Sequence, residues 1–373
     1  MYRKWKRLLV LLLSITMLAA FSPSSFSGNT TPDTVLAKSP STLSVHFIDV
    51  GQGDAELITC DGHAMLIDAG GNDKGTTVQL YLKKQGVKSL DYIIGTHPDE
   101  DHIGGLDVII TKFTCNNIFL SGFTKDTKTY DDVLSAIQYK NEKSIVPKDN
   151  ALYKLGSASF RIIGPDRTYE TANDNSIVIL LTYGKNKFLF AGDAEEAEEN
   201  GILSTQKDLK ADVYKVAHHG SRTASTSEFM KAVDPAYAVI SCGENNDYGH
   251  PHAEVLNRFR SMGIKVYRTD EQGSIIATSD GSSITWNCAP SETWQAGEAT
   301  GSSAGSSASS KTAAQSSTKT SEISYVLNTN TKKFHKASCR SVAKMSEKNK
   351  KTSTQSRDEI IAEGYTPCKI CNP

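Results

Sequence analysis

The hydrophobic residues between positions 43 and 288 follow two different periods in turn. Alternating or short apolar runs, typical of β-strands, cover 43–50, 64–68, 92–96, 159–163, 177–183, 188–191, 213–217, 237–242 and 274–278. Apolar residues at helical spacing cover 76–85, 106–110, 131–139, 194–203, 227–233 and 253–262. Because strands and helices interleave along the chain, the pattern predicts a mixed α/β (α+β) protein in which two layered sheets are flanked by helices.

Both ends of the chain lack this pattern. Residues 1–40 begin with a basic segment, followed by an apolar core over 8–21 that is short for a membrane span. This arrangement is typical of a cleaved export signal with a leader, and an uncleaved N-terminal anchor is the alternative. In either case we expect the folded part to be secreted or on the cell surface. After cleavage no stable membrane span is expected.

A stretch rich in Ser, Ala and Gly runs from 297 to 320. Such a composition cannot bury a core, so it predicts a flexible linker. The predicted organisation is a leader over 1–40, a main domain over 41–288, a linker over 289–322 and a small module over 323–373.

Charge and cysteine content narrow the choice of partner and environment. The net charge is −1, so the chain has no global positive field, and any DNA binding is expected to be local. Four of the cysteines lie in or beside apolar runs of the main domain: Cys60, Cys115, Cys242 and Cys288. Buried free thiols are the simplest interpretation, although an exported protein can also pair them as disulfides.

The segment from His97 to His102 is the densest group of chemically active side chains. It holds two imidazoles and two spaced carboxylates, those of Asp99 and Asp101, between a predicted strand and two glycines. Imidazole and carboxylate together suit zinc or manganese. The segment therefore predicts a site for one or two metal ions on a strand-to-helix loop, and a polar loop with chance histidines is the alternative.

Further carboxylates and imidazoles stand at other predicted strand ends. Asp68 is followed by Ala-Gly-Gly, Asp193 follows Ala-Gly, and His218 and His219 precede a glycine. A single residue of this kind is more often a turn residue than a ligand. Since several occur in one chain, we expect them to converge on one rim of the protein.

These motifs together resemble the metallo-β-lactamase-fold hydrolases. The pattern His97-x-Asp99-x-Asp101-His102, with an aspartate where the family usually has its second histidine, is similar to the hydrolase domain of the ComEC competence proteins. Other agreeing segments lie at 47–55, 191–193, 218–221 and 248–252. The resemblance implies a four-layer αβ/βα sandwich with two divalent metal ions, zinc or manganese.

The resemblance also implies a role for each ligand. His97 and Asp99 would hold one ion and Asp101 and His102 the second, with Asp193 bridging them. One of His218 and His219 would complete the second site, and His219 is favoured. Asp68 would orient the loop through hydrogen bonds.

The family's third motif departs from the usual pattern here. The matching stretch, 173–176, contains no histidine, which leaves the first site rich in oxygen and shifts the preference from zinc toward manganese. Asn175 and Ser176 are candidates for contacting metal-bound water or a substrate phosphate, and a turn that starts the next strand is an equal alternative. Ser221 is a further candidate for receiving a phosphate, or else part of a polar loop.

Asp101, Asp193 and His250 are the candidate catalytic residues. Two bridged metal ions activate water and clamp a phosphoryl group, and His250 could stabilise the transition state or protonate a leaving group. Asp54 is expected to be structural. The predicted function is an exported metal-dependent phosphodiesterase, a nuclease for extracellular DNA. The alternatives are a cell-wall phosphoryl (phosphorylcholine-type) esterase or lactonase, and a non-enzymatic protein that binds DNA or cell-wall polymer.

The small module carries its own metal-ligand pattern, His335-x3-Cys339 and Cys368-x2-Cys371. Three thiolates and an imidazole fit a tetrahedral structural zinc, with a disulfide plus a spare thiol as the alternative. The segment resembles the zinc module of the Ada DNA-repair proteins, but His335 replaces the methyl-accepting cysteine, so methyl transfer is not expected. Nearby lysines could bind a phosphate backbone or form a solvated basic face.

Overall fold

The structure is a computed structural model of the chain, and it describes residues 42–206, 208–297, 325–336, 339–353, 360 and 363–368. The predicted leader over 1–40, residues 298–322 of the predicted linker, and Cys371 lie outside the described residues. The described residues form a larger region up to residue 297 and a smaller region from residue 325.

Two β-sheets form the centre of the larger region. The first has eight strands in the order β15-β14-β1-β2-β3-β4-β5-β6, and neighbouring strands from β3 to β6 are parallel. Its strands are β1 (Leu43–Phe47), β2 (Glu56–Cys60), β3 (His63–Ile67), β4 (Ser89–Gly95), β5 (Thr114–Leu120), β6 (Ser144–Ile145), β14 (Ile275–Ser279) and β15 (Ile284–Trp286).

The second sheet has seven strands in the order β13-β12-β11-β10-β9-β8-β7, and neighbouring strands from β10 to β13 are parallel. Its strands are β7 (Leu152–Leu155), β8 (Ala158–Gly164), β9 (Val178–Tyr183), β10 (Asn186–Phe190), β11 (Val213–Lys215), β12 (Tyr237–Ile240) and β13 (Lys265–Arg268). The helices of the larger region are α1 (Gly75–Lys84), α2 (Glu100–Ile103), α3 (Leu106–Lys112), α4 (Lys128–Tyr139), α5 (Glu196–Thr205), α6 (Ser227–Val233), α7 (Ala253–Ser261) and α8 (Thr269–Gln272).

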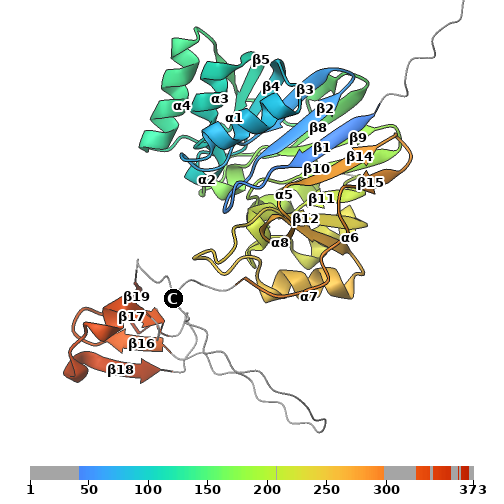
Figure 1. Cartoon of the computed structure of the whole chain (residues 1–373). Coiled ribbons are helices and arrows are strands. Elements are labelled where there is room, and N and C mark those ends of the chain that lie inside the picture. Colours follow the sequence, from blue (N-terminus) through green and yellow to red (C-terminus); the bar gives the residue numbers. More distant parts are fainter. Residues whose placement is uncertain are drawn as a thin grey trace, which may run out of the picture. The chain divides into compact units, whose positions relative to one another are not determined.

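Three hydrophobic cores stack these elements into four layers (Figure 1). The middle core lies between the sheets, where the rings of Phe47 from β1 and Phe190 from β10 are 6.3 Å apart. One outer core packs α1, α3 and α4 on the first sheet, and the other packs α5, α6 and α7 on the second. The predicted αβ/βα sandwich is therefore confirmed.

The last three residues of the strand before the histidine cluster, Ile93 to Gly95, are apolar, and both faces of the strand are buried there. Successive side chains of a strand point to opposite faces. In β4, Ile93 belongs to the helix-facing core and Ile94 to the core between the sheets. The loop after β4 is thus anchored on a strand that neighbours fix on both sides.

Most predicted elements are confirmed within a few residues. Helix α6 has the predicted bounds, and the Thr226 side chain caps its N-terminus by accepting a hydrogen bond from Phe229 N at 3.3 Å. In the larger region the sequence pattern missed β2, β5, β6, β7, β13 and β15. In β5 the first half, Thr-Cys-Asn-Asn, is polar, so its strand signal is weak. Its pairing with β4 supplies the order that local propensity does not.

The four cysteines of the larger region are free thiols, with Cys60, Cys115 and Cys242 buried and Cys288 partly exposed. Burial raises the pKa of Cys115 to about 11, so this thiol stays protonated at neutral pH. The simplest interpretation of these cysteines is confirmed.

The smaller region is a four-stranded sheet in the order β18-β16-β17-β19. Its elements are β16 (Tyr325–Asn328), β17 (Lys333–Lys336), α9 (Arg340–Ala343), β18 (Lys350–Ser353) and β19 (Thr366–Pro367). Five buried residues form its core: Tyr325, Leu327, Phe334, Ile360 and Tyr365. A core of this size is small for independent stability.

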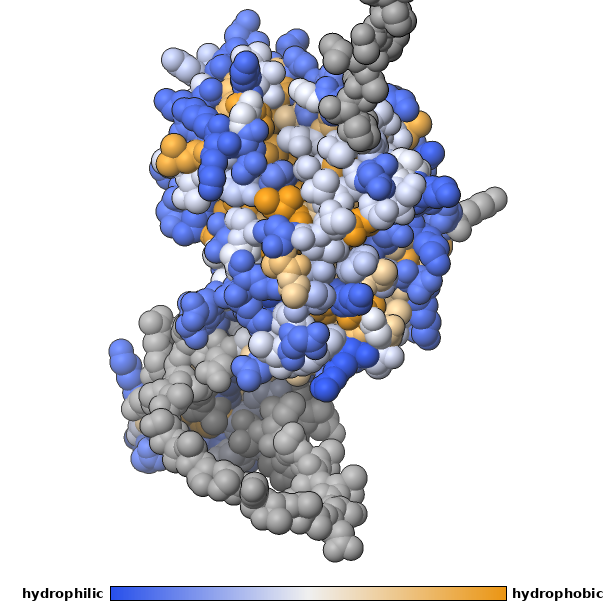
Figure 2. Space-filling model, turned by 45° about the vertical axis from the view of Figure 1, so that its right-hand side comes forward, coloured by the Kyte–Doolittle hydropathy of each residue, from blue (hydrophilic) through white to orange (hydrophobic). Residues whose placement is uncertain are grey.

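One face of the molecule is drawn in Figure 2, coloured by hydropathy. The face in Figure 2 is mostly hydrophilic, and its hydrophobic residues form small separate patches. Exposed large hydrophobic side chains among the described residues include Leu80, Tyr139 and Tyr248. Within this part of the chain, no helix combines the length and the apolar character needed to cross a membrane.

Candidate active site

One edge of the sandwich gathers the polar strand-end residues. The loops after β1, β4, β8, β10, β11 and β12 meet there around an open hollow with a cavity volume of about 100 Å³. Its lining consists of Gln52, Asp99, Asp101, Asn173, Asp193, His218, His219, Tyr248 and His250. The expected convergence of separate motifs on one rim is therefore what the structure has.

Four imidazoles surround the carboxylate of Asp193. The Nε2 atoms of His97 and His218 lie 3.8 and 3.7 Å from its Oδ2. The Nε2 atoms of His102 and His219 lie 3.2 and 3.7 Å from its Oδ1. The imidazoles thus form two pairs, one beside each oxygen of a single carboxylate.

The orientation of the first two imidazoles is set through Nδ1. His102 Nδ1 lies 2.9 Å from Asp68 Oδ2, and Asp68 also accepts hydrogen bonds from the Thr96 backbone and hydroxyl. His97 Nδ1 lies 3.2 Å from Thr96 Oγ1. An N–H at Nδ1 leaves the lone pair on Nε2, which is the atom that faces Asp193. Asp68 thus lies one hydrogen bond away from His102, in the position of a carboxylate that orients the imidazole.

The other two imidazoles are held in the same way. His219 Nδ1 lies 2.9 Å from Ser241 O and 3.2 Å from Asp54 Oδ1, and His218 Nδ1 lies 3.0 Å from Glu195 Oε1. Both histidines have left-handed backbone conformations, with φ of 49° and 53°. Such conformations are strained for residues other than glycine and concentrate at functional sites. These backbone conformations direct two adjacent side chains toward the carboxylate of Asp193.

The donor set fits metal cations. The Nε2 atoms of His97, His102 and His219 and Oδ1 of Asp193 are buried, and none of these four atoms has a hydrogen-bond partner. Burial lowers the pKa of His219, but Asp193 and Asp54 more than offset this and raise it to about 10. A divalent cation meets the same need for positive charge while the imidazoles stay neutral.

Asp101 and Asp99 differ in how they meet this cluster. Asp101 Oδ2 is 3.2 Å from His219 Nε2, and together with His102 these residues have ligand atoms within 4.8 Å of one another. Asp99 lines the hollow, but its Oδ1 pairs with Lys125 Nζ at 2.8 Å. The predicted ligand Asp99 is therefore shared between the hollow and a surface ion pair.

A buried ion pair behind His219 was missed as part of the site. Lys215 Nζ lies 2.6 Å from Asp54 Oδ2, and both side chains are almost fully buried. Gly53, with φ of +139°, lets this loop approach the Asp101 backbone so closely that a Cβ would lie 2.4 Å from its oxygen. Asp54, predicted to be structural, contacts His219 directly through Oδ1, 3.2 Å from its Nδ1.

The structure corrects the predicted substrate contacts. The Asn175 amide bonds to the backbone of Tyr169 and Thr171, so it supports the turn before β9 and does not line the hollow. Buried Ser176 Oγ accepts a hydrogen bond from Asp193 N at 3.1 Å and lies 3.4 Å from His97 Nδ1. Ser221 Oγ lies 2.9 Å from Thr223 Oγ1 within its own loop.

The residues that do line the hollow beside the candidate ligands are Gln52, Asn173 and Tyr248. All three belong to motifs that the sequence analysis identifies: the glycine-rich segment after β1, the stretch 173–176 and the segment 248–252. Their place in the lining of the hollow could have been predicted if every polar residue of each motif had been considered, and not only its titratable residue.

His250 lies in the hollow with its ring mostly buried. Its Nδ1 has no hydrogen-bond partner. Burial and the nearby imidazoles of His219 and His218 lower the pKa of His250 to about 3. A neutral imidazole can offer a hydrogen bond at neutral pH but is a poor proton donor, which favours the stabilising role over the protonating one.

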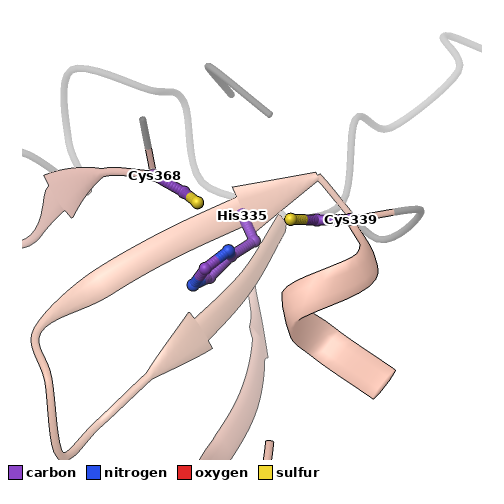
Figure 3. A group of neighbouring side chains, drawn as sticks. All are labelled: His335, Cys339 and Cys368. Carbon is purple, nitrogen blue, oxygen red and sulfur yellow. The ribbon is translucent and has the colours of Figure 1, made fainter. Parts of the chain in front are cut away.

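The smaller region contains a separate group of candidate ligands. His335 on β17, Cys339 before α9 and Cys368 after β19 are buried, and their ligand atoms lie within 4.8 Å of one another. Figure 3 shows the two sulfur atoms pointing toward each other across His335. The structure thus brings together three of the four predicted zinc ligands.

The fold and this site define the protein's class. The model of the metallo-beta-lactamase superfamily matches residues 48–244, more than half of the chain. The chain therefore belongs to the metallo-beta-lactamase superfamily, whose members are in general hydrolytic metalloenzymes.

Within that class the chain is similar to proteins of the competence type. It is 30% identical over 251 residues to ComE operon protein 3 of Bacillus subtilis, covering 62% of this chain and 32% of the relative. It is 32% identical over 240 residues to Recombination protein 2 of Haemophilus influenzae, covering 63% and 28%. It is 29% identical over 230 residues to Competence protein ComA of Neisseria gonorrhoeae, covering 61% and 31%. The chain thus spans about a third of the length of these curated relatives, and the predicted resemblance to the ComEC-type hydrolase domain is confirmed.

Proposed function

We propose that this protein is an exported metal-dependent phosphodiesterase that cuts extracellular DNA. The observation that carries the proposal is the convergence of four Nδ1-anchored imidazoles on Asp193. Hydrolysis at such a centre needs no serine or cysteine nucleophile. When bound, a pair of divalent ions in a site of this kind lowers the pKa of water and withdraws charge from a phosphodiester.

The chain's own residues divide into two ligand groups. His97 and His218, beside Asp193 Oδ2, would hold one ion together with Asp99. His102 and His219, beside Oδ1, would hold the other together with Asp101. Since each group then has two imidazoles, zinc suits the site as well as manganese, and His218 supplies the imidazole that the segment 173–176 lacks.

The remaining residues orient these ligands and the substrate. Asp68 and Asp54 fix the imidazoles of His102 and His219 through Nδ1, and Lys215 neutralises Asp54. His250, neutral at pH 7, would donate a hydrogen bond to a phosphoryl oxygen as negative charge grows there.

Two observations favour DNA as the substrate. One relative is named for recombination, a process that acts on DNA, and another is named for competence. The charge is also divided along the chain. Residues 41–288 include 24 basic and 34 acidic residues, a net charge of −10. Residues 323–373 include 10 basic and 4 acidic residues, a net charge of +6. The main domain repels a polyanion, so the basic module would tether the DNA.

The module would be held together by one structural zinc on His335, Cys339, Cys368 and Cys371. The first three already lie close together in the structure, and a fourth ligand in the Cys368-x2-Cys371 pattern matches the usual spacing of such sites.

The test of the nuclease is hydrolysis of linear and circular DNA by the full chain with Mn²⁺, Zn²⁺ or a chelator, beside Asp101→Ala and His102→Ala. We expect cutting that needs the metal and that each substitution abolishes. Absence of cutting with either metal, combined with hydrolysis of bis-p-nitrophenyl phosphate, would keep the metal chemistry and move the substrate to a cell-wall phosphoryl ester.

The tether is tested by charge removal in the full chain. Replacing the exposed Lys333, Lys336 and Lys351 with glutamine is expected to weaken DNA binding and to reduce its salt slope by about 0.9 for each phosphate that is no longer neutralised. The matched control replaces three exposed lysines of the main domain, Lys83, Lys84 and Lys88. Equal effects of the two triple variants on the salt slope would show that the module is no tether.

A further inference from the structure

The loop between β12 and α7 holds a preformed aromatic surface beside the hollow. Buried Asn246 organises this loop from within: its Nδ2 donates to the carbonyls of Gly243 and His250 at 2.9 and 2.6 Å, and its Oδ1 accepts from the backbone N–H groups of Tyr248 and His250 at 3.1 and 2.9 Å. Four hydrogen bonds thus fix the loop without any contribution from the Tyr248 ring.

The Tyr248 ring is exposed although it lies at the site. Its fractional exposure is 64%, and it lines the hollow together with Asp99, Asp101 and His250. One face of the ring stacks on the His250 ring, with centroids 5.5 Å apart and planes at 19°. A ring that is supported from behind, and that the loop does not need, presents a flat apolar surface to whatever enters the hollow.

Stacking on aromatic side chains is how proteins hold unpaired bases. Every base has a π face, so such a platform tolerates any sequence, and a single stack contributes about tenfold or more to affinity. In a duplex the base faces are already covered, and reaching them requires unstacking.

We propose that Tyr248 stacks an unpaired nucleobase next to the scissile phosphodiester, so that the substrate of this site is single-stranded DNA. This inference rests on the proposed phosphodiesterase function and names the form of DNA that the site accepts. His250 then has two roles: the face of its ring supports Tyr248, and the edge of its ring faces the phosphoryl group.

The experiment compares an oligothymidylate with an abasic oligomer of the same length, using the full chain and Tyr248→Ala, Tyr248→Phe and Tyr248→Trp. We expect the wild type to have a KM about tenfold lower for the thymidylate. Tyr248→Ala should raise the KM for the thymidylate about tenfold more than the KM for the abasic oligomer, while the aromatic variants keep the preference. Tyr139→Ala, which removes another exposed tyrosine, is the matched control.

Equilibrium binding of both oligomers separates this inference from the nuclease itself. It is measured in the wild type if that protein does not cut them, and otherwise in the Asp101→Ala background. Binding that depends on the bases and on Tyr248, without any cleavage, overturns the nuclease and keeps the platform. Cleavage with equal KM for both oligomers, or an equal effect of Tyr248→Ala on both, overturns the platform alone.

Discussion

Asp193→Asn is expected to abolish phosphodiester hydrolysis while the sandwich stays folded. In the structure this one carboxylate faces all four imidazoles, at 3.2 to 3.8 Å. An amide has a single acceptor oxygen and no charge, so it cannot serve two cations at once. Loss of the transition-state stabilisation that bound metal supplies, roughly 4 kcal/mol, corresponds to a fall in kcat/KM of about 10³-fold.

Metal analysis and kinetics on a small phosphodiester check this result together. We expect the bound metal per chain to fall along with activity, and the thermal midpoint of the metal-free protein to stay close to that of the wild type. The matched control is Asp234→Asn, because Asp234 is exposed and has a left-handed backbone that asparagine tolerates. Full activity of Asp193→Asn would remove this carboxylate from the centre of the site.

The ligand cluster could be predicted because its residues are close in sequence and chemically rare. His97 to His102 are six consecutive residues, from the loop after β4 into α2, so their pattern alone predicts a metal site. Asp193 and His219 could be added to this site because each stands at the end of a predicted strand, beside a glycine. The two buried faces of β4 explain why the pattern of this loop was clear. A strand that is packed on both faces holds the loop after it in one geometry.

The parts that were missed depend on contacts between distant segments. Lys215 looks like an ordinary polar residue of a short strand, yet its Nζ lies 2.6 Å from the carboxylate of Asp54, 161 residues away in the chain. Asn175 was a candidate for contacting metal-bound water or a substrate phosphate because of its place in the motif order, but its amide bonds to the adjacent loop. Sequence spacing gives the type of a side chain and its place on an element, and it does not give the partner.

The second large effect is expected in the C-terminal module, where Cys339→Ser should unfold the sheet β16 to β18. Among its described residues, the module's own core has five members, and a core of this size is small for offsetting the entropy of ordering the chain. A structural zinc contributes on the order of 10 kcal/mol in small zinc-stapled domains, so loss of a ligand removes most of the stability. Peptide-resolved hydrogen exchange on the full chain should show protection of residues 325–353 lost, and that of β1 to β15 kept.

Chelation of zinc from the wild type should reproduce the exchange pattern of Cys339→Ser, because both remove the same staple. The matched control is Cys288→Ser, since Cys288 is a partly exposed free thiol of the main domain. Counting thiols in the denatured protein distinguishes the zinc site from the disulfide alternative. Protection that survives chelation and disappears on reduction would identify a disulfide as the staple. The module would then be stabilised by its oxidising surroundings rather than by metal.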